Sequence, residues 1–309
     1  MTNEKEKCPV CGSADVRDVG RVFHPEPPRV AGVAIDLAGL EFHLLACGKC
    51  GFRFKRPFIP TEKLLDCYAR ADTGNWGVDP DPIQRRFDTL LAVMRRHAPA
   101  KAGGALRVLD VGCFNGAMLK YFGDEFDRYG VEPGKEPAAM AGRRGVKMLA
   151  DTIEQVEGHE GYFDVILSID VLEHINDPIA FFEKVSRLLK PGGIFIGMTG
   201  DTDAPSFRLQ GSLYWYVSKL PEHVSFWNRS SMSAAGERCG MRLVDHTRMS
   251  HARNPVSDWV VQTGMNLAFA ALRPTGGLGI PALRKRVSGR SAPNWIASAD
   301  HLIDVLRKC

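Results

Sequence analysis

Apolar residues in the second half of the chain alternate between short strand-like runs and helical spacings. The runs Leu106–Val111 and Phe163–Ser168 read as strands, and Pro178–Leu188 has the three-to-four-residue spacing of a helix. Further strands are predicted at Tyr129–Val131, Lys147–Leu149, Ile194–Met198 and Met241–His246, and further helices at Gly116–Phe122, Glu136–Arg144 and Ser230–Cys239. This alternation predicts an α/β fold with a doubly wound, mostly parallel sheet.

The remaining patterns divide the chain into three parts. Residues 1–60 are rich in Gly, Pro and Cys and form a small module, residues 61–100 form a helical connector, and residues 101–309 form the α/β domain. Residues 204–228 are expected to be irregular and aromatic. A helical insertion is expected at about 255–297, because apolar residues there repeat at helical spacing until glycines interrupt them. His301–Arg307 is the last strand candidate, with a helix as the alternative.

Composition and charge argue against two classes of protein, dedicated nucleic-acid binders and membrane-spanning proteins. Hydrophobic residues make up 44% of the 309 residues, and the net charge of +4 is well short of the concentrated charge of a dedicated nucleic-acid binder. No apolar run reaches the length of a membrane span, and the first residues contain no secretory signal, so a cytoplasmic location is expected.

Four of the eight cysteines form two CxxC pairs. Cys8 and Cys11 make the first pair, and Cys47 and Cys50 the second, each followed by glycine. Two such knuckles close a tetrahedral Cys₄ site, which has no open position for water and is therefore expected to hold a structural Zn²⁺. Free thiols or a redox pair are the alternative.

A glycine turn follows the strand that ends in Asp110. Gly112 and Gly116 let the backbone approach a ligand at a helix N-terminus, and Glu132 ends the next strand 22 residues after Asp110, where a carboxylate can accept ribose hydroxyls. The spacing departs from the GxGxxG pattern of dinucleotide sites. Asp110, Gly112, Gly116 and Glu132 are therefore candidates for binding a ligand at these strand ends.

These motifs, in this order, resemble those of class I S-adenosylmethionine-dependent methyltransferases. Val108–Gly116 is similar to motif I, with Phe114 in place of the middle glycine. Val171–His174 is similar to the VLEH segment of small-molecule enzymes that include quinone and sugar modifiers, and Lys190–Gly193 to the turn before strand five. The resemblance implies a seven-stranded Rossmann-like sheet and S-adenosyl-L-methionine as cofactor, with Asp151 near the adenine. The residues it implies at the cofactor are Asp110, Gly112, Cys113, Phe114, Asn115, Gly116, Glu132, Asp151 and Asp170.

Candidates for a catalytic base lie after strands four and five. His174 belongs to the VLEH segment, and Glu222 and His223 precede the helix at Ser230. The segment around Glu222 resembles sugar C-methyltransferases that share the two CxxC pairs, but Leu220 and Pro221 replace the tyrosine and histidine of that family. O-methylation with a Glu222–His223 base and orienter is therefore favoured over C-methylation. Tyr214, Trp215 and Tyr216 are candidates for a lid, a sugar-stacking wall or simple anchors of the loop.

Three functional hypotheses follow. The first is a methyltransferase that acts on a sugar, a polysaccharide precursor or a natural product. The second is a zinc-ribbon RNA methyltransferase, which the slight charge and the absence of an NPPY-like motif after strand four disfavour. The third is a cofactor-binding protein without turnover, for which Phe114 in the glycine motif is the only support.

Overall fold

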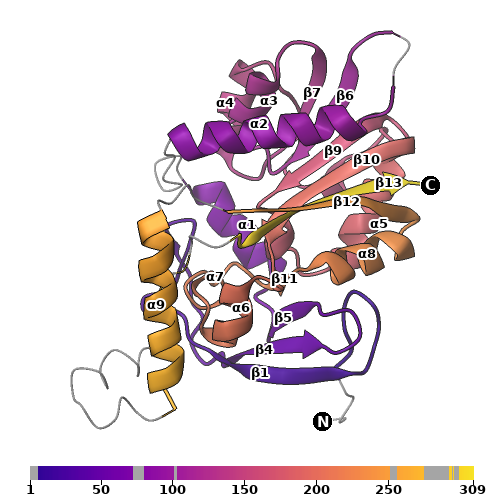
Figure 1. The fold of residues 1–309 in the computed structure, drawn as a ribbon. Helices are drawn as coiled ribbons and strands as arrows, with labels where there is room; N and C mark the ends of the chain where they lie inside the picture. Colours follow the sequence, from indigo (N-terminus) through magenta and orange to yellow (C-terminus); the bar gives the residue numbers. More distant parts are fainter. Residues whose placement is uncertain are drawn as a thin grey trace.

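The computed structural model describes residues 6–71, 80–100, 103–250, 256–274, 292–293, 295 and 299–309, with backbone alone at 80–84 (Figure 1). The strands are β1 Val16–Val22, β2 Arg29–Val30, β3 Val33–Ala34, β4 Phe42–Cys47, β5 Arg53–Arg56, β6 Leu106–Val111, β7 Phe126–Val131, β8 Lys147–Ala150, β9 Phe163–Ile169, β10 Leu189–Gly200, β11 Ser225–Phe226, β12 Met241–Met249 and β13 His301–Lys308. The α-helices are α1 Thr61–Arg70, α2 Pro80–His97, α3 Ala117–Phe122, α4 Lys135–Arg143, α5 Pro178–Leu188, α6 Pro205–Gln210, α7 Trp215–Ser218, α8 Arg229–Arg238 and α9 Val256–Leu272.

The central sheet has seven strands in the order β12-β13-β10-β9-β6-β7-β8. The strands from β10 to β8 are parallel to one another, whereas β13 lies antiparallel between β10 and β12. The strand at the end of the chain is thus confirmed, and the helical alternative for this segment is wrong. The α/β class and the mostly parallel seven-stranded sheet are also confirmed.

Helices cover both faces of this sheet, as in a doubly wound fold (Figure 1). On one face, Leu90 and Met94 of α2 and Leu119 of α3 share a core with Val108 and Val165 of the sheet. The opposite face carries α5 and α8, whose apolar residues share a core with the alternate strand positions, such as Leu109 and Ile166. Alternation of side chains across each strand therefore supplies two cores from one sheet.

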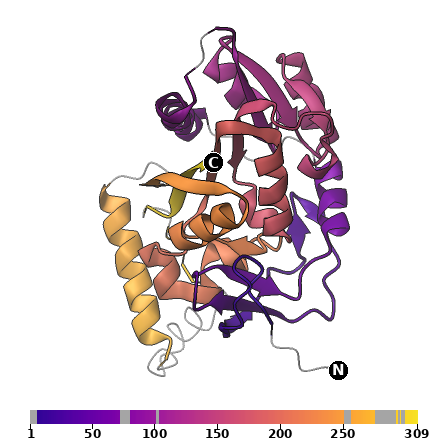
Figure 2. The ribbon, with the colours of Figure 1, turned by 90° about the vertical axis from the view of Figure 1, so that its right-hand side faces the viewer.

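The N-terminal residues form a second sheet, which is completed by a strand from the segment just before α8. Its strand order is β1-β4-β5-β11, so its last strand comes from residues 225–226 (Figures 1 and 2). Phe52 contacts the fully buried Trp227, with ring centroids 4.8 Å apart. The division of the chain at residue 60 stays a prediction, and the observed sheet crosses that boundary.

Two local expectations differ from the structure. Lys190–Gly193, expected as a separate turn, lies within β10, because Leu189 already pairs with Phe163 and the register shifts before Ile194. Residues 204–228, expected to be irregular, contain the short helices α6 and α7 and the strand β11. Tyr214 and Tyr216 are buried there, and their hydroxyls bond to buried carboxylates, which favours an anchoring role.

The helix α9 leaves the sheet between β12 and β13 and stands at the margin of the molecule (Figure 1). It occupies the first part of the insertion expected at about 255–297, and most of the remainder of that range lies outside the described residues. None of the helices in the described part of the chain combines the length and apolar character of a membrane span.

Candidate functional site

The turn after β6 brings the backbone close to the loop that follows β9. Gly112 has φ +76°, and its amide donates to the Val131 carbonyl over 2.8 Å. A Cβ atom at Gly112 would lie 2.4 Å from Val171 Cγ2, so only glycine fits between these two strand ends. The turn predicted to bind the cofactor and the VLEH segment are therefore in direct contact.

Glu132 is fixed by two backbone amides. The Phe114 amide donates to Oε2 and the Gly134 amide to Oε1, each over 2.8 Å. Each carboxylate oxygen can accept a second hydrogen bond, so both keep capacity for a ligand hydroxyl. Burial raises the pKa of Glu132, while the two amides lower it. The geometry suits a carboxylate held ready for two adjacent hydroxyls.

Asp110 lies at the end of β6 and is almost fully buried. Burial, followed by the charge of Glu132, raises its pKa well above the usual range. Its Oδ1 atom has no hydrogen-bond partner in the described part of the chain. An acidic wall with a free buried oxygen suits a cationic or hydroxyl-rich ligand such as S-adenosylmethionine.

Three other predicted cofactor residues shape the turn through their backbone or short contacts. The Asn115 side chain accepts from the Ala117 amide over 3.0 Å and so begins α3. Gly116 has φ +72° and packs against Ala141 of α4. The Cys113 thiol is buried 3.9 Å from the Met148 sulfur.

Two more of the predicted cofactor residues, Asp151 and Asp170, lie at the ends of β8 and β9. Asp151, just after β8, is exposed. Asp170, at the end of β9, has φ +55° and forms an ion pair with Arg86 of α2, with an N–O distance of 2.6 Å. His301 Nε2 lies 3.9 Å from the other carboxylate oxygen of Asp170. Asp170 thus joins the sheet edge to α2 and β13.

His174 and His223 lie together, with ring centroids 4.9 Å apart. Nδ1 of His174 lies 2.9 Å from the Tyr68 hydroxyl and 3.2 Å from the Glu222 carbonyl oxygen. Burial lowers the pKa of His174. The sequence analysis brought out both histidines but missed Tyr68, which comes from the connector helix α1.

His223 has a defined orientation. Its Nδ1 lies 3.0 Å from the Tyr216 carbonyl, and a carbonyl only accepts, so Nδ1 carries the proton and Nε2 carries the lone pair. Burial and the nearby His174 lower the pKa of His223 well below its usual value, so the ring is neutral near neutral pH. The backbone of Tyr216 orients this ring, and not the Glu222 carboxylate as expected.

Glu222 faces the N-terminal sheet. Its carboxylate is buried, its Oε2 has no hydrogen-bond partner in the described ranges, and burial raises its pKa. The charge of Lys55 acts on it in the opposite direction. Lys55 is fully buried on β5 and donates to the Leu220 carbonyl over 2.9 Å. No sequence signal distinguished Lys55 from a surface lysine.

Glu173 occupies the centre of this cluster. Its two oxygens accept from the Thr199 hydroxyl at 2.8 Å and the Tyr216 hydroxyl at 2.5 Å. Burial, followed by the charge of Asp170, raises the pKa of Glu173 to about 7. Glu173 stands in the VLEH segment, so the motif could have drawn attention to it.

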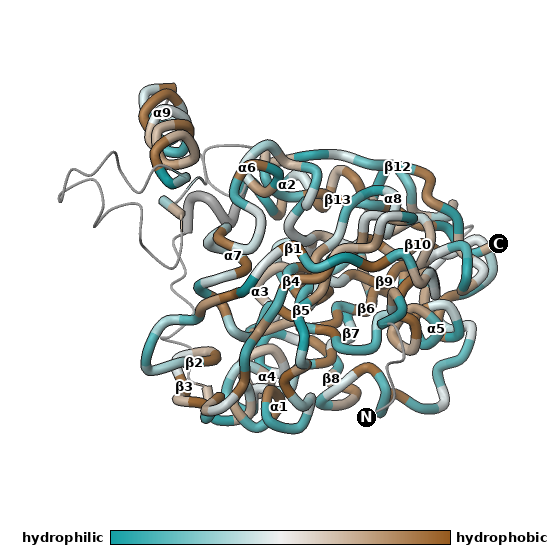
Figure 3. Tube along the Cα trace, turned by 90° about the horizontal axis from the view of Figure 1, so that it is seen from below, coloured by the Kyte–Doolittle hydropathy of each residue, from teal (hydrophilic) through white to brown (hydrophobic). Residues whose placement is uncertain are grey.

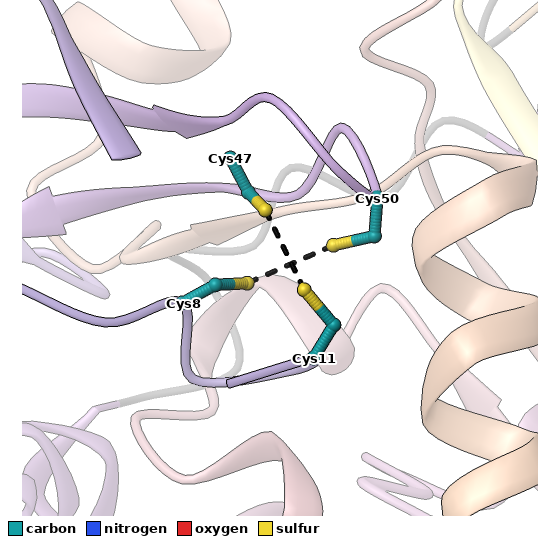
Figure 4. A group of neighbouring side chains, drawn as sticks. All are labelled: Cys8, Cys11, Cys47 and Cys50. Atoms are coloured by element: carbon teal, nitrogen blue, oxygen red, sulfur yellow. Dashed lines mark hydrogen bonds between the residues drawn. The ribbon is translucent and has the colours of Figure 1, made fainter. Parts of the chain in front are cut away.

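The four paired cysteines converge on one point (Figure 4). The sulfurs of Cys8 and Cys50 are 3.7 Å apart, and those of Cys11 and Cys47 are 3.5 Å apart. A tetrahedral zinc with Zn–S bonds of about 2.3 Å needs sulfurs about 3.8 Å apart, so the donor set fits zinc. None of the eight cysteines, all within the described ranges, is in a disulfide.

Comparison with known proteins assigns the sequence to one family. A family model described as a methyltransferase domain matches residues 74–246, which is more than half of the chain. A ubiquinone biosynthesis O-methyltransferase from Paramagnetospirillum magneticum is 32% identical over 201 residues, covering 57% of this chain and 78% of the relative. One from Methylobacterium nodulans is 30% identical over 200 residues, covering 58% and 76%.

A solved geranyl diphosphate C-methyltransferase from Streptomyces coelicolor has a TM-score of 0.47 and 16% identity, with 72% of this chain and 77% of that chain covered. Three features agree with the family match: the glycine turn, the acids at the ends of β6 and β7, and the order of the seven strands in the sheet. The chain belongs to the methyltransferase domain family and is a class I S-adenosylmethionine-dependent methyltransferase.

Proposed function

We propose that this enzyme methylates a hydroxyl oxygen of a small molecule, with His223 as the general base. The observation that carries the proposal is the fixed tautomer of His223, whose Nε2 lone pair lies beside the VLEH loop. That loop in turn contacts the glycine turn at Gly112. The relatives named as ubiquinone biosynthesis O-methyltransferases support transfer to oxygen.

The cofactor is proposed to lie at the carboxyl ends of β6, β7 and β9. Glu132 would accept the ribose hydroxyls, Asp110 would offer its unpartnered Oδ1 to the cofactor, Asp170 would provide negative charge, and Asp151 would lie toward the adenine. Gly112, Cys113, Phe114, Asn115 and Gly116 would form the turn around it. S-adenosylmethionine, when bound, supplies a methyl group already activated on a sulfonium.

The protein's own chemical work is then to position the acceptor and remove its proton. Nε2 of His223 takes the hydroxyl proton, while Nδ1–H continues to donate its hydrogen bond to the Tyr216 carbonyl oxygen. This bond keeps the ring in its orientation as positive charge develops on it. Glu222, whose carboxylate is buried nearby, stabilises positive charge on His174 through space. His174, held by Tyr68, forms the adjoining side of the acceptor site.

The acceptor is proposed to be a sugar, a sugar-linked precursor or a natural product. The four cysteines Cys8, Cys11, Cys47 and Cys50 are proposed to hold one structural zinc. That module supplies Lys55 to the region of Glu222, so it contributes to the shape of the acceptor site.

The test is the variant His223→Gln, assayed with labelled S-adenosylmethionine against nucleotide sugars, small phenols and an RNA pool. We expect methylation of a small hydroxyl compound by the wild type, and a kcat lowered by about 10²–10⁴-fold in the variant. Because the pKa of His223 is lowered, the acidic limb of the wild-type kcat profile should lie below the pH at which free imidazole titrates, and the variant should lose it.

The matched control is His43→Gln, which changes an exposed histidine on β4 and should retain wild-type kcat. Methylation of RNA alone, or a His223→Gln enzyme with unchanged kcat and pH profile, would overturn the proposal.

A further inference from the structure

The helix α9 has its apolar and polar sides reversed relative to a normal surface helix. A surface helix of a globular protein turns its apolar stripe to the core. In α9 the exposed side chains are apolar: Val256 is 80% exposed, and Val260, Val261 and Leu267 are each between 55% and 57% exposed. Of the ten large hydrophobic side chains exposed in the described residues, six lie on this helix.

The polar side of α9 attaches it to the protein. Asn266 is buried and bonds to Gln210 of α6, which also donates to the Pro293 carbonyl over 3.2 Å. Phe269 is the main apolar residue that α9 buries, beside Leu213 and Ala292. Figure 3 shows α9 at the margin of the molecule, with hydrophobic positions along it. The attachment therefore fixes which side faces outward.

The stretch of sequence that contains α9 carries most of the net charge of the chain. Residues 250–293 contain six Lys or Arg residues and one Asp, a charge of +5, whereas the whole chain carries +4. All but one of these cations follow α9, beginning with the exposed Arg273. The rest of the chain is thus nearly neutral, and the apolar helix is followed in the sequence by a cationic stretch.

A surface hollow of about 410 Å³ lies at the end of α9. Its lining includes Arg21, Arg208 and Arg273 together with the exposed Val19 and Leu209. Arg21 pairs with Glu41 and Arg208 with Asp203, so the positive charge of this hollow comes mainly from Arg273. Guanidinium groups beside exposed apolar side chains suit a phosphate headgroup above acyl chains.

We propose that α9 binds the surface of an anionic lipid bilayer, lying in the interface with Val256, Val260, Val261 and Leu267 in the acyl region. Apolar helices next to cationic sequence are typical of proteins that bind anionic bilayers, because each cation near the anionic surface adds attraction. A second copy of the chain is a poorer occupant, because two copies of a segment of charge +5 would be brought together. This inference does not depend on the proposed acceptor or base.

The experiment is vesicle flotation with the full chain. Vesicles of phosphatidylcholine with about 30% phosphatidylglycerol are compared with phosphatidylcholine alone, at low and high salt. The variant Val260→Ser/Val261→Ser/Leu267→Ser removes the outward apolar face without changing charge. Leu40→Ser, at an exposed leucine near β4, is the matched control.

We expect the wild type and the Leu40→Ser control to float with the anionic vesicles, less so at high salt or with neutral vesicles. The triple variant should bind at least about 10-fold more weakly. A folded wild type that floats with neither kind of vesicle would overturn the proposal. A triple variant that binds the anionic vesicles as tightly as the wild type would overturn it too. A dimer that the triple variant converts to a monomer, without vesicle binding, would assign α9 to self-association instead.

Discussion

Two residues at the site adopt a backbone conformation that side chains other than glycine rarely take. Phe114, after β6, has φ +48°, and Asp170, after β9, has φ +55°. Such conformations cost about 1–3 kcal/mol each and persist where neighbouring contacts impose them. Here the Phe114 amide is held by Glu132 and the Asp170 carboxylate by Arg86. The replacement of the usual glycine by Phe114 is thus accommodated by a hydrogen bond that sequence alone does not reveal.

Glu173 should make the stability of the enzyme depend on pH. Its pKa is about 7 in the folded protein against 4.5 for an ordinary glutamate, so between these values only the folded state binds the proton. Stability therefore falls as pH rises from about 4.5 to 7. Glutamine cannot ionise, so Glu173→Gln should be more stable than the wild type at pH 8, by about 1–3 kcal/mol.

Urea unfolding at pH 5 and pH 8 measures this difference, which should shrink at the lower pH. The control Glu183→Gln, at an exposed position of α5, should show little change at either pH. An equal effect of Glu173→Gln at both pH values would show that the carboxylate is ionised throughout.

At the scale of elements, the pairing of β5 with β11 connects the cysteine cluster to the acceptor side. Ser225 pairs with Phe54, and the Lys55 amide donates to the Val224 carbonyl over 2.9 Å. Val224 in turn donates to the Glu173 carbonyl over 2.8 Å. The segment that carries His223 is therefore fixed between the N-terminal sheet and the VLEH loop.

Removal of the metal should act through this connection. The purified enzyme should contain about one zinc per chain, and Cys8→Ser/Cys11→Ser should lose it, because two thiolates cannot close a tetrahedral site. The double variant should lose methyl transfer as β5 and β11 loosen, while it still binds S-adenosylmethionine. Metal analysis and calorimetry measure both effects.

Cys309→Ser, at an exposed cysteine, provides the control and should keep the zinc. Zinc near zero in a folded and active wild type would refute the metal site.

The elements of the sheet were predictable because each depends on local pattern. β6 and α5 begin and end at the predicted residues, and β13 was predicted from its branched side chains. The bulge at the start of β10 and the short elements α6, α7 and β11 were not predicted. They depend on tertiary contacts, such as the pairing of β11 with β5, that lie outside any sequence window.

At the scale of the molecule, the sequence predicted a site at the carboxyl ends of the parallel strands but did not show which side chains from other parts of the chain lie beside it. Glu132 and Asp110 were predicted as cofactor residues because each stands at the end of an apolar strand. Lys55 and Tyr68 could not be found, because nothing near them in sequence marks them, and only the folded chain brings β5 and α1 to the histidines. Long-range packing thus completes a site whose motifs are local.

The central claim is that the carboxyl ends of β6 and β7 bind S-adenosylmethionine through Glu132. Calorimetric titration of the cofactor into the wild type and Glu132→Ala tests it most directly, with the exposed Glu160→Ala as control. Loss of one charge-assisted hydrogen bond of about 1.5–3 kcal/mol should weaken binding by about 10- to 150-fold. Unchanged affinity in a folded Glu132→Ala enzyme, or a wild type that binds no S-adenosylmethionine, would contradict the account.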